Sequence, residues 1–195
     1  MRESGAEALK PQSVAFAAAL ALVACSTPEP APPAGSASVA AQDTAPFRGT
    51  TSPVHKVRTA RPRPAPPILR AVHAATHRGY DRVVFEFSSD SVPGYHVEYS
   101  DRPARECGSG AEVRLAGAGR LIVRLEPARA HDESGNPTLL DRERAPGLPL
   151  LQEMKLVCDF EGQVEWVLGL TVATPYRVQE LAAPPRLVVD LRHRE

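Results

Sequence analysis

The fold is decided by Gln163-Val-Glu-Trp-Val-Leu-Gly-Leu-Thr-Val172, in which apolar residues recur at every second position. Val164, Trp166, Leu168 and Leu170 fall on one side of an extended chain, the pattern of a strand with one buried face. The same period of two runs through residues 82–88, 95–99, 121–126 and 187–191. These five stretches predict a protein built from half-buried β-strands.

Weaker strand candidates lie between these stretches, at residues 68–76, 112–116, 152–160 and 176–181. Glycine and proline turns separate the candidates, and no amphipathic helical stripe is present, although residues 138–144 have the pattern of a short helical turn. The sequence therefore predicts an all-β fold, a single β-sandwich of about eight or nine mostly antiparallel strands, with an open barrel as the alternative.

The strand pattern is confined to residues 68–195, which we expect to form one domain. This region has 16 Lys and Arg residues against 19 Asp and Glu residues, a net charge of −3. Its length is sufficient for one hydrophobic core. So small a net charge does not select a strongly charged partner such as a nucleic acid.

Upstream of Cys25, residues 14–24 form an uncharged apolar run of about 11 residues, which matches a signal-peptide core and is too short to span a bilayer. The residues Leu22-Val-Ala-Cys25 resemble a bacterial lipoprotein signal, in which the cysteine is lipidated and becomes the mature N-terminus. We therefore expect residues 1–24 to be removed and Cys25 to carry the lipid. A short buried helix with a core cysteine is the alternative.

The resemblance to a lipoprotein signal implies a location in the cell envelope, facing the periplasm or the exterior. Ser26 follows the cysteine in place of the aspartate that favours retention in the inner membrane. If the source is Gram-negative, the resemblance therefore implies the outer membrane. Export also excludes a nucleic-acid partner.

Between Cys25 and the domain, residues 26–67 hold ten of the chain's 20 prolines and lack apolar periodicity. Such a composition buries too little surface to offset the entropy of ordering. We expect residues 25–67 to form a disordered tether rich in proline and alanine.

Two further cysteines, Cys107 and Cys158, remain once Cys25 is lipidated. An exported protein is exposed to conditions in which they can form a disulfide, with two free thiols as the alternative. Alternation with Met154 and Leu156 predicts that Cys158 faces the core. No cysteine or histidine spacing typical of a metal site is present.

The densest cluster of titratable residues is His131-Asp132-Glu133, directly after a predicted strand. A histidine and a carboxylate at a strand end are suitable for acid–base catalysis, but Asp132 is equally suited to capping the turn that follows. His73 and His77 would lie too far apart on a strand to share a metal. No catalytic or phosphate-binding motif is present. We therefore predict no enzymatic activity, no cofactor and no metal.

Several segments together resemble the AMIN-like domain family of bacterial envelope proteins. They are His77-Arg-Gly-Tyr-Asp-Arg-Val-Val-Phe-Glu-Phe87, Pro93-Gly-Tyr-His-Val-Glu-Tyr99, Ala128-Arg-Ala-His-Asp-Glu-Ser-Gly135, Cys158-Asp-Phe-Glu-Gly162 and Pro184-Pro-Arg-Leu-Val-Val-Asp-Leu191. Related AMIN domains are non-catalytic β-sandwich modules that target or bind peptidoglycan. The resemblance also places His131 and Asp132 in a recurring family segment, which makes them candidate ligand-binding residues.

Three functions follow as hypotheses. The first is a non-catalytic envelope lipoprotein, held to the membrane by its lipid, whose domain binds peptidoglycan or a wall-associated partner. The second is an assembly factor that docks onto an envelope complex such as a secretion pore, through an exposed sheet edge that recruits a partner strand. The third is a hydrolase that uses His131 and Asp132. The amidase arrangement, with a catalytic domain attached, is not expected here.

Overall fold

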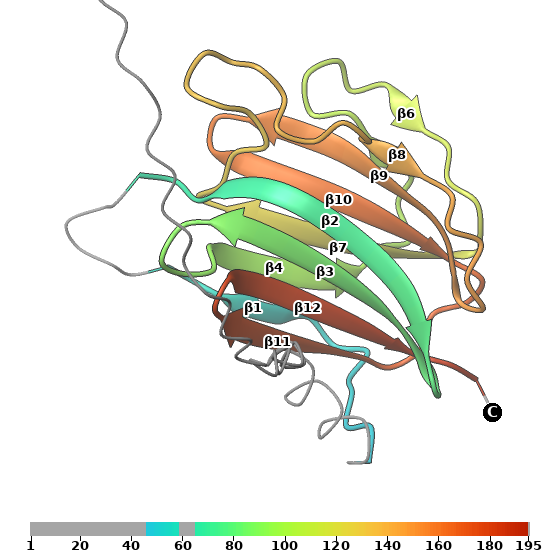
Figure 1. The fold of residues 1–195 in the computed structure, drawn as a ribbon. Helices are drawn as coiled ribbons and strands as arrows, with labels where there is room; N and C mark the ends of the chain where they lie inside the picture. Colours follow the sequence, from blue (N-terminus) through green and yellow to red (C-terminus); the bar gives the residue numbers. More distant parts are fainter. Residues whose placement is uncertain (1–45, 59–64, 195) are drawn as a thin grey trace, which may run out of the picture.

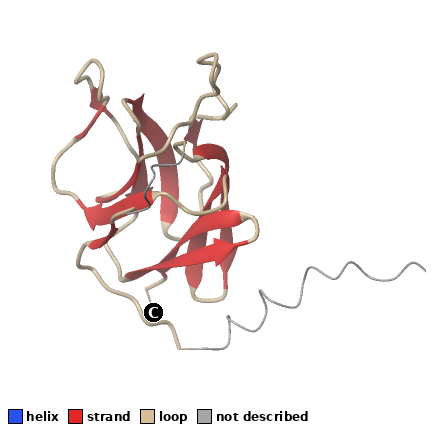
Figure 2. Cartoon of the chain, turned by 90° about the vertical axis from the view of Figure 1, so that its left-hand side faces the viewer, coloured by secondary structure: helices blue, strands red, loops and turns tan. Residues whose placement is uncertain are grey.

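The computed structural model describes residues 46–58 and 65–194, and within these ranges the chain forms strands and loops without a helix (Figure 1, Figure 2). The strands are β1 (Val54–Lys56), β2 (Ile68–His77), β3 (Tyr80–Ser88), β4 (Gly94–Tyr99), β5 (Ala104–Arg105), β6 (Glu112–Val113), β7 (Gly119–Glu126), β8 (Glu143–Arg144), β9 (Leu151–Phe160), β10 (Gln163–Leu170), β11 (Tyr176–Ala182) and β12 (Pro185–Arg192). The described ranges therefore contain no helix that could cross a membrane.

Two antiparallel sheets make up the body of the domain. One has six strands in the order β1-β4-β7-β10-β9-β8, and the other has four in the order β11-β12-β3-β2. A separate two-stranded sheet pairs β5 with β6. The predicted all-β sandwich is confirmed. The strands outnumber the predicted eight or nine because β1, β5 and β8 have three residues or fewer, too few for a periodic pattern.

The core lies between the two sheets, on the alternating apolar positions that the sequence marks. Trp166 of β10 and Phe85 of β3 are both fully buried, and their rings meet edge to face across the sheets at a centroid distance of 6.3 Å. The alternating residues Leu121, Val123 and Leu125 of β7 are also fully buried. Contacts between the two inner faces therefore hold the layers together.

The structure corrects the expected extent of the tether, because residues 46–58 are part of the folded unit. β1 pairs with β4 at the edge of the six-stranded sheet. The backbones of Thr50 and Tyr176 exchange two hydrogen bonds of 2.8 Å, and the Tyr176 hydroxyl lies 2.8 Å from the Ser52 carbonyl oxygen. Pairing with an existing sheet thus orders a segment whose own composition favours disorder. The expected signal peptide, Cys25 and the tether up to residue 45 lie outside the described residues.

The short helical turn expected at residues 138–144 is wrong. Residues 143 and 144 instead form β8, which pairs with β9 at the other edge of the six-stranded sheet. The backbone N–H of Leu156 in β9 also donates to the Arg142 carbonyl at 2.8 Å. Pairing with β9 therefore prevails over a weak local helical tendency.

The expected orientation of Cys158 is also wrong, because β9 contains a bulge. Leu156 is opposite Trp166, on the core side, but Cys158 is opposite Glu165, so Val157 is the extra residue that shifts the alternation. Cys158 therefore lies on the outer face of the sheet. It is nevertheless only 6% exposed.

The cover over this part of the outer face is residues 101–116, which include β5 and β6 and which we call the flap. Cys107 of the flap forms a disulfide with Cys158, and its backbone N–H donates to the Val157 carbonyl at 3.1 Å. Ala104 of the flap packs with Val157 and Val167 in a small second apolar cluster. The flap therefore covers the outer face over β9 and β10, while the face over β1, β4 and β7 has a groove.

Candidate binding groove

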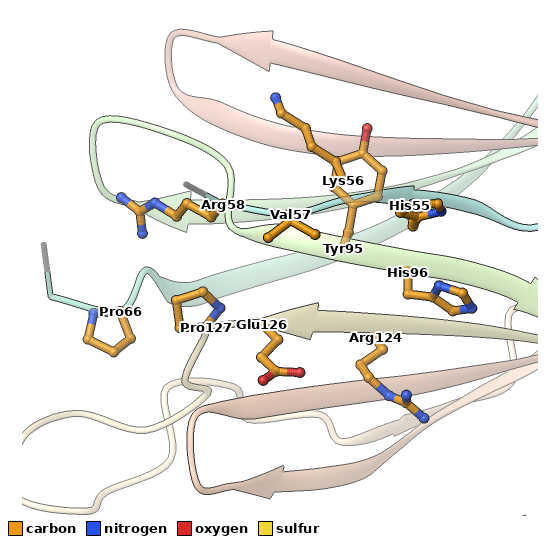
Figure 3. Close-up of a pocket in the computed structure, with 10 residues that line it drawn as sticks. All are labelled: His55, Lys56, Val57, Arg58, Pro66, Tyr95, His96, Arg124, Glu126 and Pro127. Atoms are coloured by element: carbon orange, nitrogen blue, oxygen red, sulfur yellow. The ribbon is translucent and has the colours of Figure 1, made fainter. Parts of the chain in front are cut away.

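A groove of about 590 Å³ lies at the end of the outer face where β1, β4 and β7 are neighbours (Figure 3). Ten residues line it: His55, Lys56, Val57, Arg58, Pro66, Tyr95, His96, Arg124, Glu126 and Pro127. They come from three strands, from the segments that follow β1 and β7, and from the segment that precedes β2. The groove is thus assembled from parts of the chain that are distant in sequence.

Strand register explains how the polar side chains of the groove come together. His55 is the partner of His96 in β4, and His96 is the partner of Arg124 in β7. The flanking residues Tyr95 and Val97 belong to the core, so alternation turns His55, His96 and Arg124 outward. Figure 3 shows these three side chains in succession at one end of the groove, with Arg58 and Pro66 at the other.

The polar groups of the groove are mainly cations and hydrogen-bond donors. Arg124 Nε donates to Glu165 Oε2 at 2.8 Å, and the Arg124 side chain remains 40% exposed. Arg58 Nη2 donates to Ser91 Oγ at 3.2 Å, while Arg58 Nη1 is buried and has no hydrogen-bond partner among the described residues. Glu126 is the one carboxylate in the lining.

The two histidines of the groove lie side by side. The His55 and His96 rings are 6.2 Å apart between centroids and are inclined by 30°. His96 Nε2 lies 3.1 Å from Glu98 Oε2, at the edge of the exposed face. Each imidazole carries ring nitrogens that can take part in hydrogen bonds.

Apolar surface completes the groove. Val57 is 74% exposed, and Pro66 and Pro127 lie nearby in the lining (Figure 3). Next to the groove, Gly94 begins β4, and a Cβ there would collide with the Glu126 carbonyl oxygen of β7. Glycine is therefore required for β4 to lie this close to β7.

Lys56 and Tyr95 turn their side chains away from the groove, toward β11. Lys56 Nζ lies 2.7 Å from Glu180 Oε2, and the Tyr95 hydroxyl donates to Glu180 Oε1 at 3.1 Å. Burial, followed by the charge and hydrogen bond of Glu180, raises the pKa of Tyr95 to about 12. The phenol therefore stays protonated at neutral pH and links the two sheets.

Comparison with known families gives a match to the AMIN-like domain over residues 67–193. The chain belongs to this family. No curated protein matches the chain. AMIN-like domains are associated with the cell envelope and with peptidoglycan-related interactions, so family membership assigns the protein an envelope role. In this AMIN-like protein five groove residues precede the matched range: His55, Lys56, Val57, Arg58 and Pro66.

Asp132, one of the two residues singled out by the sequence, holds its own loop together. Its Oδ1 accepts hydrogen bonds of 2.9 Å from the backbone N–H groups of Ser134 and Asn136, and its Oδ2 accepts from the Asn136 side chain at 3.1 Å. Hydrogen bonds from the side chain and backbone of Asn136 are the main reasons that the pKa of Asp132 lies below its usual value. The carboxylate therefore caps a turn.

His131, the other singled-out residue, faces a different carboxylate. Its Nδ1 lies 2.9 Å from Asp159 Oδ1, which also accepts the backbone N–H of Ala130 at 2.9 Å. Arg142 Nη2 is 3.4 Å from the second oxygen of Asp159. The side chains of His131 and Asp132 thus contact different partners, and neither lines the groove.

Of the cysteines, the predicted Cys107–Cys158 disulfide of the AMIN-like domain is present, whereas Cys25 lies outside the described residues. No group of three or more His, Cys, Asp or Glu side chains within residues 46–58 and 65–194 is arranged to hold a metal ion. His73 and His77 both belong to β2.

The groove could not be predicted from the sequence. His96 and Arg124 are outward residues of two predicted strands, but their adjacency depends on strand order, which the sequence does not determine. His55 and Arg58 lie in a segment whose prolines predict disorder. No periodic signal marks this segment, because the apolar residues of Val54-His-Lys-Val57 are three positions apart rather than two.

Proposed function

We propose that this AMIN-like domain is a non-catalytic binding module that holds peptidoglycan, or a wall-associated partner, in the groove formed by β1, β4 and β7. The observation that supports the proposal is the groove itself, in which two guanidinium groups and two imidazoles surround exposed apolar surface. Peptidoglycan presents peptides with free carboxylates beside N-acetylated sugars. Such a ligand matches both the cationic groups and the apolar surface of the groove.

The Arg58 Nη1 donor, which has no partner within the described part of the chain, supports an anionic ligand in particular. A buried polar group without a partner costs about 1–3 kcal/mol, and a carboxylate from the ligand would remove that cost. Arg124 offers donors beyond the one it shares with Glu165. Because the groove is open to solvent, we expect binding to weaken as the salt concentration rises.

A sacculus-binding assay tests the proposal. The full chain should sediment with purified sacculi, and an Arg58→Gln/Arg124→Gln variant should bind at least about tenfold more weakly, equivalent to the loss of about 1.4 kcal/mol. The matched control is Arg102→Gln/Arg114→Gln, which removes the same charge from two exposed positions elsewhere. Equal binding by all three proteins would place the ligand outside the groove.

We also propose that the mature protein is a lipoprotein anchored through Cys25, with residues 1–24 removed. The support is the Leu22-Val-Ala-Cys25 sequence and the apolar run before it. Mass spectrometry of the membrane fraction should find a mature chain that begins at an acylated Cys25, and Cys25→Ala should be released from membranes. A mature chain that begins elsewhere, without acylation, would contradict this. If the source is Gram-negative, the acylated chain should fractionate with the outer membrane.

We also propose that His131 and Asp132 do not catalyse hydrolysis. Asp132 is engaged by its own loop, and His131 is engaged by Asp159. We expect no release of soluble fragments from sacculi by the full chain. Fragment release that is lost in His131→Gln/Asp132→Asn would instead support a hydrolase.

A further inference from the structure

The outermost strand β2 has the longest edge among the outer strands of the described sheets (Figure 1). Backbone groups of successive residues in such a strand point alternately toward and away from the neighbouring strand. Arg144 Nη1 donates to the Val72 carbonyl at 2.6 Å from outside the sheet, so residue 72 points its backbone groups away from β3. By alternation, Ala74 and Thr76 do the same.

Other parts of the chain cover only the first half of this edge. The backbone N–H of Leu69 donates to the Arg129 carbonyl at 2.7 Å, and Thr138 Oγ1 donates to the Leu69 carbonyl at 2.6 Å. Arg144 then covers Val72. The outward backbone groups of Ala74 and Thr76 have no comparable partner among the described residues, and no proline or bulge interrupts pairing there.

Space for another strand adjoins these two residues. A slot of about 440 Å³ lies between β2 and the segment that contains β8, with Ala74 on one side and Glu143 and Arg144 on the other. Met154, which is fully buried, lies beneath the slot. An added strand would therefore lie between β2 and the segment that contains β8.

Charge distinguishes among possible occupants of the slot. The carboxylates of the far wall have partners, since Glu143 Oε1 lies 2.7 Å from Lys155 Nζ and Asp141 Oδ2 lies 3.8 Å from Arg144 Nε. Arg70, His73 and Arg78 of the β2 region are exposed, and no ion pair to them is present in the described part of the chain. The outer side of the β2 edge is therefore positively charged.

We propose that β2 recruits an extended segment of a partner protein as an additional strand, with backbone pairing at Ala74 and Thr76 and acidic side chains facing outward beside Arg70 and Arg78. This surface lies apart from the groove and goes beyond wall binding. A second copy of this chain fits less well, because antiparallel pairing centred on Ala74 would bring Arg70 of one copy beside Arg78 of the other. Like charges at such a position are destabilising.

The test uses a fluorescein-labelled peptide of alternating glutamate and valine, with a lysine–valine peptide as its matched control. The full chain should bind the glutamate peptide at least about tenfold more tightly. Ala74→Pro should weaken that binding about tenfold, because it removes an outward N–H that β3 does not use. Arg70→Gln/Arg78→Gln should weaken binding of the glutamate peptide about fivefold and should not weaken binding of the lysine peptide, because it removes like charges beside the lysines.

Amide exchange in the unmodified protein supplies a readout that does not depend on any variant. In the free protein the amides of Ala74 and Thr76 should exchange quickly and those of His73 and Ala75 slowly, and the glutamate peptide should slow the first pair. Equal binding of the two peptides, or protection that omits Ala74 and Thr76, would overturn the proposal. So would a dimer of the chain that forms without peptide and is abolished by Ala74→Pro.

Discussion

At the scale of single residues, Asp81 shows how one buried carboxylate joins distant parts of the domain. It is fully buried, and its Oδ2 accepts the backbone N–H groups of Leu150 and Leu151 at 2.7 and 2.9 Å. His193 Nε2 lies 2.8 Å from Oδ1, which ties the end of β12 to the same point. We expect Asp81→Asn to lower the free energy of unfolding by about 2 kcal/mol at pH 7, measured by urea denaturation. The control Asp90→Asn, at an exposed position, should change it by less than about 0.5 kcal/mol.

The same carboxylate predicts a pH dependence. Burial alone raises the pKa of Asp81, but hydrogen bonds from Leu151, His193, Leu150 and Thr76 outweigh it and hold the pKa below its usual value. Between the folded and unfolded pKa values of Asp81, the unfolded chain binds more protons than the folded chain. The contribution of Asp81 to the free energy of unfolding is therefore present above about pH 4 and is lost as the pH falls through the folded pKa. The stability difference between wild type and Asp81→Asn should therefore narrow below pH 4. A difference that stays constant down to pH 2 would contradict this account.

At the scale of elements, the flap depends on its disulfide more than on its own strands, which have two residues each. The Cys107–Cys158 bond spans a sequence separation of 51 residues. By the loop-entropy argument, Cys107→Ser/Cys158→Ser should reduce the free energy of unfolding by about 4 kcal/mol. Hydrogen exchange should accelerate most in the flap, and reduction of the wild type should reproduce both effects. Acceleration spread evenly over β3 and β10 would show that the flap is not a separate unit.

Elements with several alternating residues could be predicted from the sequence, and elements shaped by their neighbours could not. β3, β7, β10 and β12 follow the apolar period because alternate residues of each strand face the core between the sheets. The bulge at Val157 reverses the expected orientation of Cys158, because the extra residue is accommodated by pairing with β10 and leaves no periodic signal. The disulfide could still be predicted, since it followed from export and an even cysteine pair rather than from orientation.

At the scale of the whole molecule, the groove was not predictable because it depends on strand order. His55, His96 and Arg124 become neighbours only when β1, β4 and β7 lie side by side. Local patterns predict that each strand exists but do not specify its partners. The family match does not include the side of the groove formed by β1 either, since the match begins at residue 67, after β1.

The last prediction concerns where the functional unit begins. A chain that starts at residue 46 should match the full chain in stability and in binding to sacculi, because it retains Thr50, Ser52 and β1. A chain that starts at residue 65 should lose about 3 kcal/mol, since the hydrogen bonds to Tyr176 and the β1–β4 pairing are removed. It should stay folded, because the Trp166–Phe85 core lies elsewhere, and circular dichroism checks this. It should nevertheless bind sacculi at least about tenfold more weakly, because His55, Val57 and Arg58 are absent from the groove. Undiminished binding by the folded shorter chain would show that the segment before the matched family domain contributes stability alone, and that the ligand site lies on another face.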